Sequence, residues 1–261
     1  MLALLQKLES STNRFQFVQS RSYIRQRMSI IDQQQLIQML SHVSKHKQNQ
    51  PVVYEEHFHF FKADVKSVES IWYIKQIRDP LERALSQYSY RRYRCDVLRI
   101  LRGCSQMDLS CKNLTLDQCI SSGNRSRCVS RPCGVASVIS FFCGQDPICD
   151  DTFTQPNTAA ALSLAKTNIE RYYSYVGLLE YFESSLQLLE YIHSPMFDGI
   201  SQIYSESKRK RVNALPNKYR IPVSNETRSI LRQLLKNEFD LYNFVQKRFI
   251  DQYRSVFGRS P

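Results

Sequence analysis

The stretch IWYIKQIRDPLE, residues 71–82, decides the fold. Its first seven residues are rich in β-branched and aromatic side chains, as in a buried strand, and a helix start follows at once. Asp79 is placed to cap a helix, Pro80 suits the first helical position, and Glu82 at the third position completes a capping box. We therefore predict a strand that leads directly into a helix ending near Tyr93.

Similar signals recur along the chain. Strands are expected at residues 51–54 and 173–179, because both are short apolar runs bounded by polar residues. Helices are expected where apolar side chains recur every three or four residues, at residues 32–42, 157–172 and 180–193, and in one long C-terminal helix. Strands that alternate with helices predict an α/β fold with a central parallel sheet, in a single domain over residues 1–261.

The composition limits the function before any site is chosen. The chain has 36 Lys and Arg against 24 Asp and Glu, and this net charge of +12 favours a polyanionic partner. The longest apolar stretch, residues 135–143, is too short for a membrane span, and the first nine residues lack a signal-peptide cleavage site. Glycosylation sequons begin at Asn113, Asn124 and Asn225, and they have meaning only in the secretory pathway.

All eight cysteines fall within residues 95–149. No pair has the C-x-x-C spacing and no histidine lies in that window, so disulfides explain them better than a metal site. An even number of cysteines in one loop-rich stretch indicates an oxidising compartment such as the lumen of the ER or Golgi. We expect a disulfide-rich insertion at residues 95–149, no metal, and no nucleic-acid partner.

Two histidines, His57 and His59, follow the first predicted strand, at the end where open α/β sheets bind ligands. An imidazole there can take a proton from a hydroxyl nucleophile near neutral pH. Two partly buried surface histidines would give the same pattern. The residues alone favour that simpler interpretation.

Arg78 stands at the carboxyl end of the next strand, with Ser86 two turns into the following helix. A guanidinium beside a helix N-terminus offers two donors to a phosphate, and a hydroxyl adds another. An ion pair of Arg78 with Asp79 or Glu82 fits the sequence equally well. The basic run at residues 208–211 is either an anion clamp or a solvated surface.

Several motifs occur together in a characteristic order. They are MSIIDQ at residues 28–33, HFHF at 57–60, IRDPLER at 77–83, FFCGQDPIC at 141–149 and VGLLE at 176–180. In this order and spacing, over nearly the whole chain, they resemble the glycosaminoglycan uronyl 2-O-sulfotransferases. That family includes the uronyl 2-sulfotransferases and the heparan sulfate 2-O-sulfotransferases.

The resemblance implies a P-loop-kinase-like fold and a reaction. The family passes a sulfuryl group from 3′-phosphoadenosine 5′-phosphosulfate (PAPS) to the 2-hydroxyl of uronic acid in dermatan/chondroitin or heparan sulfate. His57 matches the catalytic base, with His59 in support, and Arg78 and Ser86 match positions that hold the 3′-phosphate of the donor. The resemblance further assigns Tyr204, Lys210 and Lys218 to a loop over the nucleotide, Arg91, Arg92 and Arg94 to the glycan, and disulfides Cys119 to Cys128 and Cys143 to Cys149.

The resemblance also concerns the start of the chain. The first strand of the family and its Lys- and Ser/Thr-containing phosphosulfate loop would precede the first helix, and Met1 aligns just after that loop. We therefore expect an N-terminally truncated form of a Golgi type II membrane protein, without that strand, that loop or the anchor, and with a homotrimer as the family assembly. The alternative is a catalytically inactive relative that binds sulfated glycan or partners an active transferase.

Overall fold

The computed structural model describes residues 1–20, 27–46, 50–63, 71–96, 114–123, 125–129, 137–150, 158–207 and 222–261. Within these ranges the side chains of residues 91–96, 126, 127 and 158 are not described. The elements in chain order are α1 (Leu2–Thr12), β1 (Gln16–Gln19), α2 (Ile30–His46), β2 (Val52–Glu55), β3 (Tyr73–Ile77), α3 (Pro80–Asp96), α5 (Leu116–Ser121), α6 (Arg125–Val129), α7 (Val138–Cys143), η1 (Pro147–Cys149), α8 (Thr158–Tyr172), β4 (Tyr173–Leu178), η2 (Leu179–Tyr181), α9 (Phe182–Ile192), α10 (Ile200–Ser207), α11 (Asn225–Leu234) and α12 (Lys236–Phe257).

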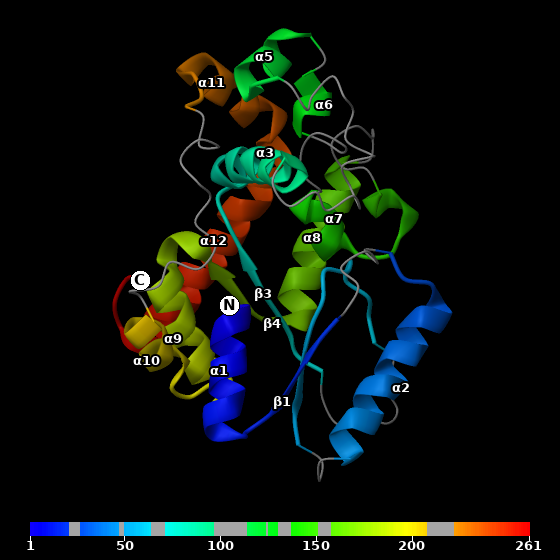
Figure 1. Ribbon diagram of the computed structural model, residues 1–261, viewed down its shortest axis with the longest axis vertical. Helices are drawn as coiled ribbons and strands as arrows, with labels where there is room; N and C mark the ends of the chain where they lie inside the picture. Colours follow the sequence, from blue (N-terminus) through cyan, green and yellow to red (C-terminus); the bar gives the residue numbers. More distant parts are fainter. Residues whose placement is uncertain are drawn as a thin grey trace.

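The strands form two parallel pairs. β1 pairs with β2 from Gln16↔Val52 onward, and β3 pairs with β4 with one irregularity after Tyr73. All four strands run in the same direction in Figure 1, with α3 beyond the carboxyl end of β3. The predicted α/β class and parallel pairing are therefore present. In the described residues, however, the sheet is two separate two-stranded sheets and not one continuous central sheet.

The main hydrophobic core surrounds β3 and β4. β4 is buried at every residue except Ser174, and α8, α9 and α12 pack around it (Figure 1). Leu186 and Leu189 of α9 are fully buried, as their helical spacing predicted, and Phe249 of α12 is 1% exposed. A separate small cluster of Met28, Leu36 and Phe61 holds α2 on the β1–β2 side.

The prediction of one long C-terminal helix is wrong. The chain forms two helices, because Leu235 leaves the helical conformation at φ −96° and ψ 16°. α11 packs on α3, α5 and α6, whereas α12 packs mainly on α8 and β4, with smaller contacts to α3, α7 and α9. A break at Leu235 lets each helix bury its own apolar stripe, since the two stripes face different neighbours.

The capping box at the start of α3 is also only half present. Asp79 Oδ1 accepts a hydrogen bond from the Glu82 amide at 2.9 Å, as predicted. The amide of Asp79, however, donates to Glu180 Oε1, at the end of β4. The Glu180 contact therefore replaces the second half of the capping box. The Glu82 side chain pairs instead with Arg78 and Arg228.

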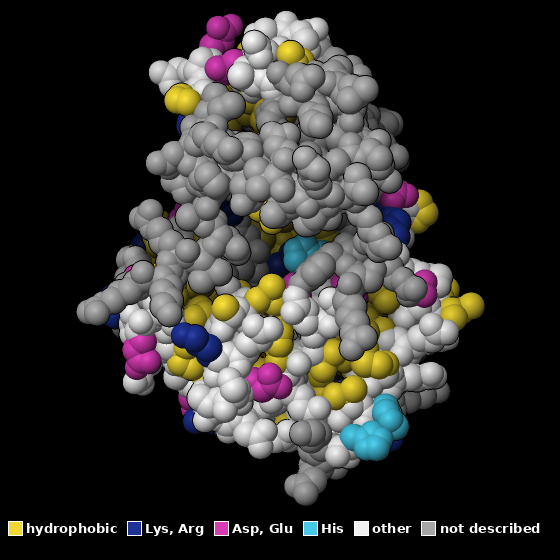
Figure 2. Space-filling view, viewed as in Figure 1, with side chains coloured by type: hydrophobic (Ala, Val, Ile, Leu, Met, Phe, Trp, Pro, Cys, Tyr) yellow, Lys and Arg dark blue, Asp and Glu magenta, His cyan; other side chains and the backbone are white. Residues whose placement is uncertain are grey.

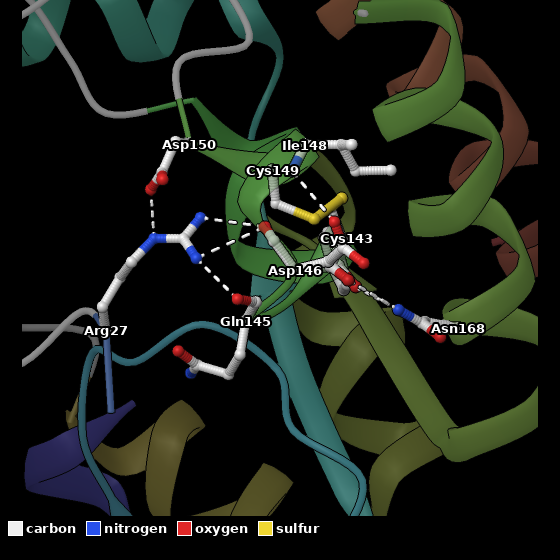
Figure 3. The surroundings of a disulfide bond; sticks show 9 residues. Arg27, Cys143, Gln145, Asp146, Ile148, Cys149, Asp150 and Asn168 are labelled. Atoms are coloured by element: carbon white, nitrogen blue, oxygen red, sulfur yellow. Dashed lines mark hydrogen bonds and ion pairs between the residues drawn. A yellow bond between two sulfur atoms is a disulfide. The ribbon is translucent and has the colours of Figure 1, made fainter. Parts of the chain in front are cut away.

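The loop of residues 143–149, closed by the Cys143–Cys149 disulfide, joins the two halves of the molecule (Figure 3). On one side, Asn168 of α8 donates to the carbonyls of Phe142 and Cys143 at 2.9 Å. On the other side, Arg27 donates to the carbonyl of Gln145 at 2.7 Å and forms an ion pair with Asp150. The segment before α2 is thus fixed to the β3–β4 half through this loop.

Candidate functional site

A cavity of about 2040 Å³ lies between β2 and β3, and every residue of both strands lines it. It extends from Pro51 and Trp72, just before the two strands, to His57 and Arg78, just beyond their carboxyl ends. In Figure 2 the middle of the visible face is hollowed, with hydrophobic side chains around the hollow and a histidine and a basic side chain inside it. This cavity is therefore the candidate functional site.

His57 lines this cavity two residues beyond the carboxyl end of β2. Its Nδ1 is 3.3 Å from Glu55 Oε1, and the His57 side chain is 61% exposed, against 22% for Glu55. Burial raises the pKa of Glu55, while the nearby His57 opposes this shift. A carboxylate on Nδ1 orients the imidazole and leaves Nε2 as the nitrogen that can accept a proton.

The loop that carries His57 is fixed against α7. The amide of Phe60 donates to the carbonyl of Phe141 at 2.8 Å, and Gln145 Nε2 donates to the carbonyl of His59 at 2.7 Å. Gly144, at φ 107°, makes this approach possible, because a Cβ atom there would lie 2.6 Å from the Phe60 carbonyl oxygen. The HFHF and FFCGQ motifs therefore form one structural unit.

His59 has a different environment from His57. It is 5% exposed and its ring packs edge-on against Phe141 at 5.0 Å. Burial, together with the charges of Arg27 and Lys75, lowers the pKa of His59 to about 4. This side chain is neutral near pH 7, and it is not among the residues that line the cavity.

Arg78 lines the cavity beside the start of α3. Its guanidinium forms an ion pair with Glu82 at 3.6 Å, which is the alternative that the sequence left open. Glu82 also pairs with Arg228 at 3.3 Å, so Glu82 keeps a cationic partner when Arg78 turns to another anion. The side chains of Arg78 and Arg228 are 35% and 38% exposed. Ion pairs at such exposed sites contribute little to stability.

Besides Arg78, the cavity is lined by Lys75 of β3 and Arg83 of α3, neither of which was predicted as a site residue from the sequence. Burial and the charge of Arg83 lower the pKa of Lys75 to about 8, and its ammonium lies 4.4 Å from the centre of the Phe141 ring. Arg83 pairs with the buried Glu238 at 3.3 Å. The available signal was a lysine in the middle of a strand that also carries Tyr73, Ile74 and Ile77, where a charge is costly to bury without a role.

The other predicted site residues are not all brought together. Tyr204 of α10 lines the same cavity and packs against Phe182. Ser86 is exposed on α3 and is not among the lining residues. Lys210 and Lys218 lie outside the described residues, and so do the side chains of Arg91, Arg92 and Arg94 on α3.

The cysteine and sequon positions can be placed in part. Cys119–Cys128 and Cys143–Cys149 are both disulfides in the structure, and the other four cysteines lie outside the described residues or have undescribed side chains. Asn225 is exposed as the first residue of α11, whereas Asn113 and Asn124 lie outside the described residues. In the parts of the chain described here, no three His, Cys, Asp or Glu residues are grouped to hold a metal, and no helix is long and apolar enough to span a membrane.

Comparison with known proteins identifies the family. No protein-family model matches the chain. It is 30% identical to mouse uronyl 2-sulfotransferase over 252 residues, which is 95% of this chain and 58% of the mouse protein. It belongs to the glycosaminoglycan uronyl 2-O-sulfotransferase family.

Other members of this family are similar to the chain at nearly the same level of identity. Human uronyl 2-sulfotransferase is 30% identical over 95% of this chain and 59% of its own length. Heparan sulfate 2-O-sulfotransferase 1 of Xenopus laevis is 31% identical over 85% of this chain and 59% of its own. The chain therefore spans about three fifths of the length of these relatives.

Proposed function

We propose that this sulfotransferase-family protein transfers a sulfuryl group from PAPS to the 2-hydroxyl of uronic acid residues in dermatan/chondroitin or heparan sulfate. The observation that carries the proposal is a cavity lined both by His57 with its carboxylate partner Glu55 and by a group of cations that includes Lys75, Arg78 and Arg83. The acceptor hydroxyl needs a base to remove its proton. The phosphorylated donor needs positive charge around its phosphate groups.

On the acceptor side, His57 acts as the base. Glu55 holds Nδ1, so that Nε2 takes the proton of the 2-hydroxyl as the hydroxyl oxygen attacks sulfur. The resulting imidazolium is stabilised by the Glu55 carboxylate, in the manner of other carboxylate–histidine pairs. The large exposed fraction of His57 leaves it accessible to a polysaccharide, which cannot enter a closed site.

On the donor side, the residues present fit a nucleotide with phosphate groups. Arg78 lies beside the N-terminus of α3, where a helix dipole favours an anion, and Lys75 and Arg83 place two more cations in the same cavity. PAPS supplies the sulfuryl group when it is bound. The cations position it and stabilise charge that develops on the leaving phosphate, which is the main catalytic requirement of such transfers.

The net charge and the relatives support the proposed acceptor class. A net charge of +12 favours a polyanionic chain over a neutral one, and the relatives are named for uronyl and heparan sulfate substrates. A Golgi lumen location, a membrane anchor in the full protein and a homotrimer are part of the proposal, with the two disulfides as support for an oxidising compartment.

A transfer assay tests this function. Radiolabelled PAPS is incubated with desulfated dermatan and desulfated heparan chains, using the 261-residue chain and a form extended at Met1 by the upstream region of mouse uronyl 2-sulfotransferase. We expect 2-O-sulfated uronic acid in the product from at least the extended form. Binding of sulfated glycan without any transfer by either form would instead support the inactive relative.

A further inference from the structure

The proposed function gives no role to the VGLLE motif. The last residue of this motif, Glu180, lies in η2, directly after β4. Glu180 Oε1 accepts a hydrogen bond from the amide of Asp79 at 2.9 Å, and Glu180 Oε2 accepts one from the Tyr242 hydroxyl at 3.0 Å. These three residues lie just outside the set that lines the cavity, whereas the chain neighbours Leu179 and Arg78 belong to that set. The hydrogen bonds of Glu180 are therefore next to the lining of the cavity and not part of it.

Asp79 is bound at its amide, its side chain and its carbonyl. The amide donates to Glu180, Oδ1 accepts from the Glu82 amide at 2.9 Å, and the carbonyl accepts from the Arg83 amide at 2.8 Å. Only the first of these bonds connects Asp79 to an element outside α3. Because the peptide group between Arg78 and Asp79 is planar, a bond to the Asp79 amide also fixes the Cα atom of Arg78. Glu180 therefore determines the direction in which the Arg78 side chain leaves the backbone.

Tyr242 connects Glu180 to the main core. It is 6% exposed and lies on α12, which contacts both β4 and α3 (Figure 1). Burial and the charge of Glu180 raise the pKa of Tyr242 above that of an ordinary phenol, so the hydroxyl keeps its proton and remains a donor. Since a buried donor is costly to leave unpaired, this bond holds the exposed Glu180 carboxylate in one position.

The bond from Asp79 to Glu180 also separates two tasks at the start of α3. In a complete capping box, the Glu82 side chain would accept the bond from the Asp79 amide. In this structure Glu180 accepts it. Glu82 pairs with Arg78 and Arg228 instead. Arg78 can therefore exchange Glu82 for a phosphate without loss of a helix cap. A site that is already in place before the ligand arrives has a lower cost of binding.

We propose that Glu180, held by Tyr242, is a positioning residue for the sulfate donor: it fixes the peptide group between Arg78 and Asp79 and so directs Arg78 at a phosphate group of PAPS. The inference rests on the proposed function, because the position of Arg78 matters only if this arginine binds the donor. A helix cap with no further role would affect stability alone. A carboxylate that simply repelled the donor would weaken its binding. The three roles therefore predict different effects of substitution.

Calorimetric titration with adenosine 3′,5′-bisphosphate tests the inference, on both the 261-residue chain and the form extended at Met1. Glu180→Ala removes both hydrogen bonds and should lower the affinity about tenfold, whereas Glu180→Gln keeps an acceptor for the Asp79 amide and should stay within about twofold of the unsubstituted protein. Tyr242→Phe, which removes a single hydroxyl, should lower the affinity about threefold. In an Arg78→Ala background, Glu180→Ala should have no further effect, because a positioning residue acts only through the residue that it positions.

Tyr253→Phe is the matched control. Tyr253 lies on the same helix, is 2% exposed and donates to Gln187 Oε1 of α9 at 2.8 Å. This variant should lower the free energy of unfolding as Tyr242→Phe does and leave the affinity unchanged. Equal affinity losses in the two tyrosine variants would overturn the inference, as would unchanged or tighter binding by Glu180→Ala, or an additive loss in the Arg78→Ala background. Failure of both unsubstituted forms to bind the bisphosphate would overturn the proposed function, and this inference with it.

Discussion

The β1–β2 half and the β3–β4 half of this molecule differ in packing and in chemistry. β4 is buried at five of its six residues, and the main core lies around it. β1 has no buried residue, β2 has one, and α2 packs through the small cluster of Met28, Leu36 and Phe61. Lys75 lies in β3, Arg78 follows it and Arg83 lies in α3, all in the β3–β4 half. Glu55 is the last residue of β2 and His57 lies two residues beyond it.

This difference suggests a division of tasks. The well-packed half is suited to hold the charged donor of the proposed reaction, because cations held in place by packing need little reorganisation when the charge develops. A less buried half with an exposed imidazole is suited to admit a polysaccharide. The loop of residues 143–149 and its disulfide keep the two halves in register, as Figure 3 shows for Arg27 and Asn168 on its two sides.

Removal of the base is expected to have the largest effect. In the extended form, His57→Ala should lower turnover by about 10²- to 10⁴-fold, the usual contribution of a general base, while binding of adenosine 3′,5′-bisphosphate is retained. Sulfate transfer and calorimetric titration measure the two. His46→Ala, on the exposed face of α2 and outside the cavity, is the control. Near-normal turnover of His57→Ala would rule out this assignment.

A pair of leucine substitutions compares the packing of the two halves directly. Leu186→Ala, at a fully buried site beside β4, should lower the free energy of unfolding by about 3–5 kcal/mol. Leu36→Ala, at an 8% exposed site in the smaller cluster, should cost about 2 kcal/mol, because its surroundings can collapse more easily. Denaturant unfolding measures both. Equal losses would mean that the two halves are equally well packed.

The buried carboxylate of Glu238 joins three elements of the β3–β4 half. It accepts hydrogen bonds from the Ser137 hydroxyl and the amide of Val138, and it pairs with Arg83. Glu238→Gln leaves Arg83 without this counter-charge and should cost about 3 kcal/mol of unfolding free energy. The exposed Glu226→Gln on α11 is the matched control. A loss no larger than that of the control would show that the pair contributes nothing net.

The orienting role of Glu55 predicts a smaller effect than removal of the base. Glu55→Gln in the extended form should lower turnover about tenfold with little change in donor affinity, since one charge-assisted hydrogen bond is lost at a partly exposed site. Glu56→Gln serves as the control, because Glu56 bonds to Tyr54 and not to His57. If the two variants behave alike, Glu55 does not position the base.

The smallest effect is a pH dependence that comes from Lys75. Its pKa is lowered to about 8, so its charge is lost as pH rises from 7 to 9. Affinity for adenosine 3′,5′-bisphosphate should fall about fivefold over that range, the equivalent of about 1 kcal/mol, and Lys75→Met should remove this fall. The free energy of unfolding should rise between about pH 8 and 10.5, because there the unfolded chain binds more protons than the folded one. A flat binding profile in the unsubstituted chain would place Lys75 away from the donor.

Much of the local structure followed from the sequence. The strand and helix predicted at residues 71–93, the strand predicted at 173–179 and the helix before it depend on short-range patterns, and the structure has these elements with ends shifted by no more than three residues. α1 and β1 were not predicted, because Leu2–Thr12 mixes apolar and polar residues without a cap and Gln16–Gln19 is only four residues long. Such short elements are stable only through tertiary packing.

The sequence by itself determined the family, the α/β class and the positions of His57 and Arg78, because these depend on motif order and local periodicity. Only the tertiary structure decided that Lys75 and Arg83 share their cavity, that Ser86 does not line it, and that Glu55 faces His57. It also decided that the sheet is divided between β2 and β3. The reason is physical: side-chain burial and strand order arise from contacts between residues far apart in the chain, and no local pattern records them.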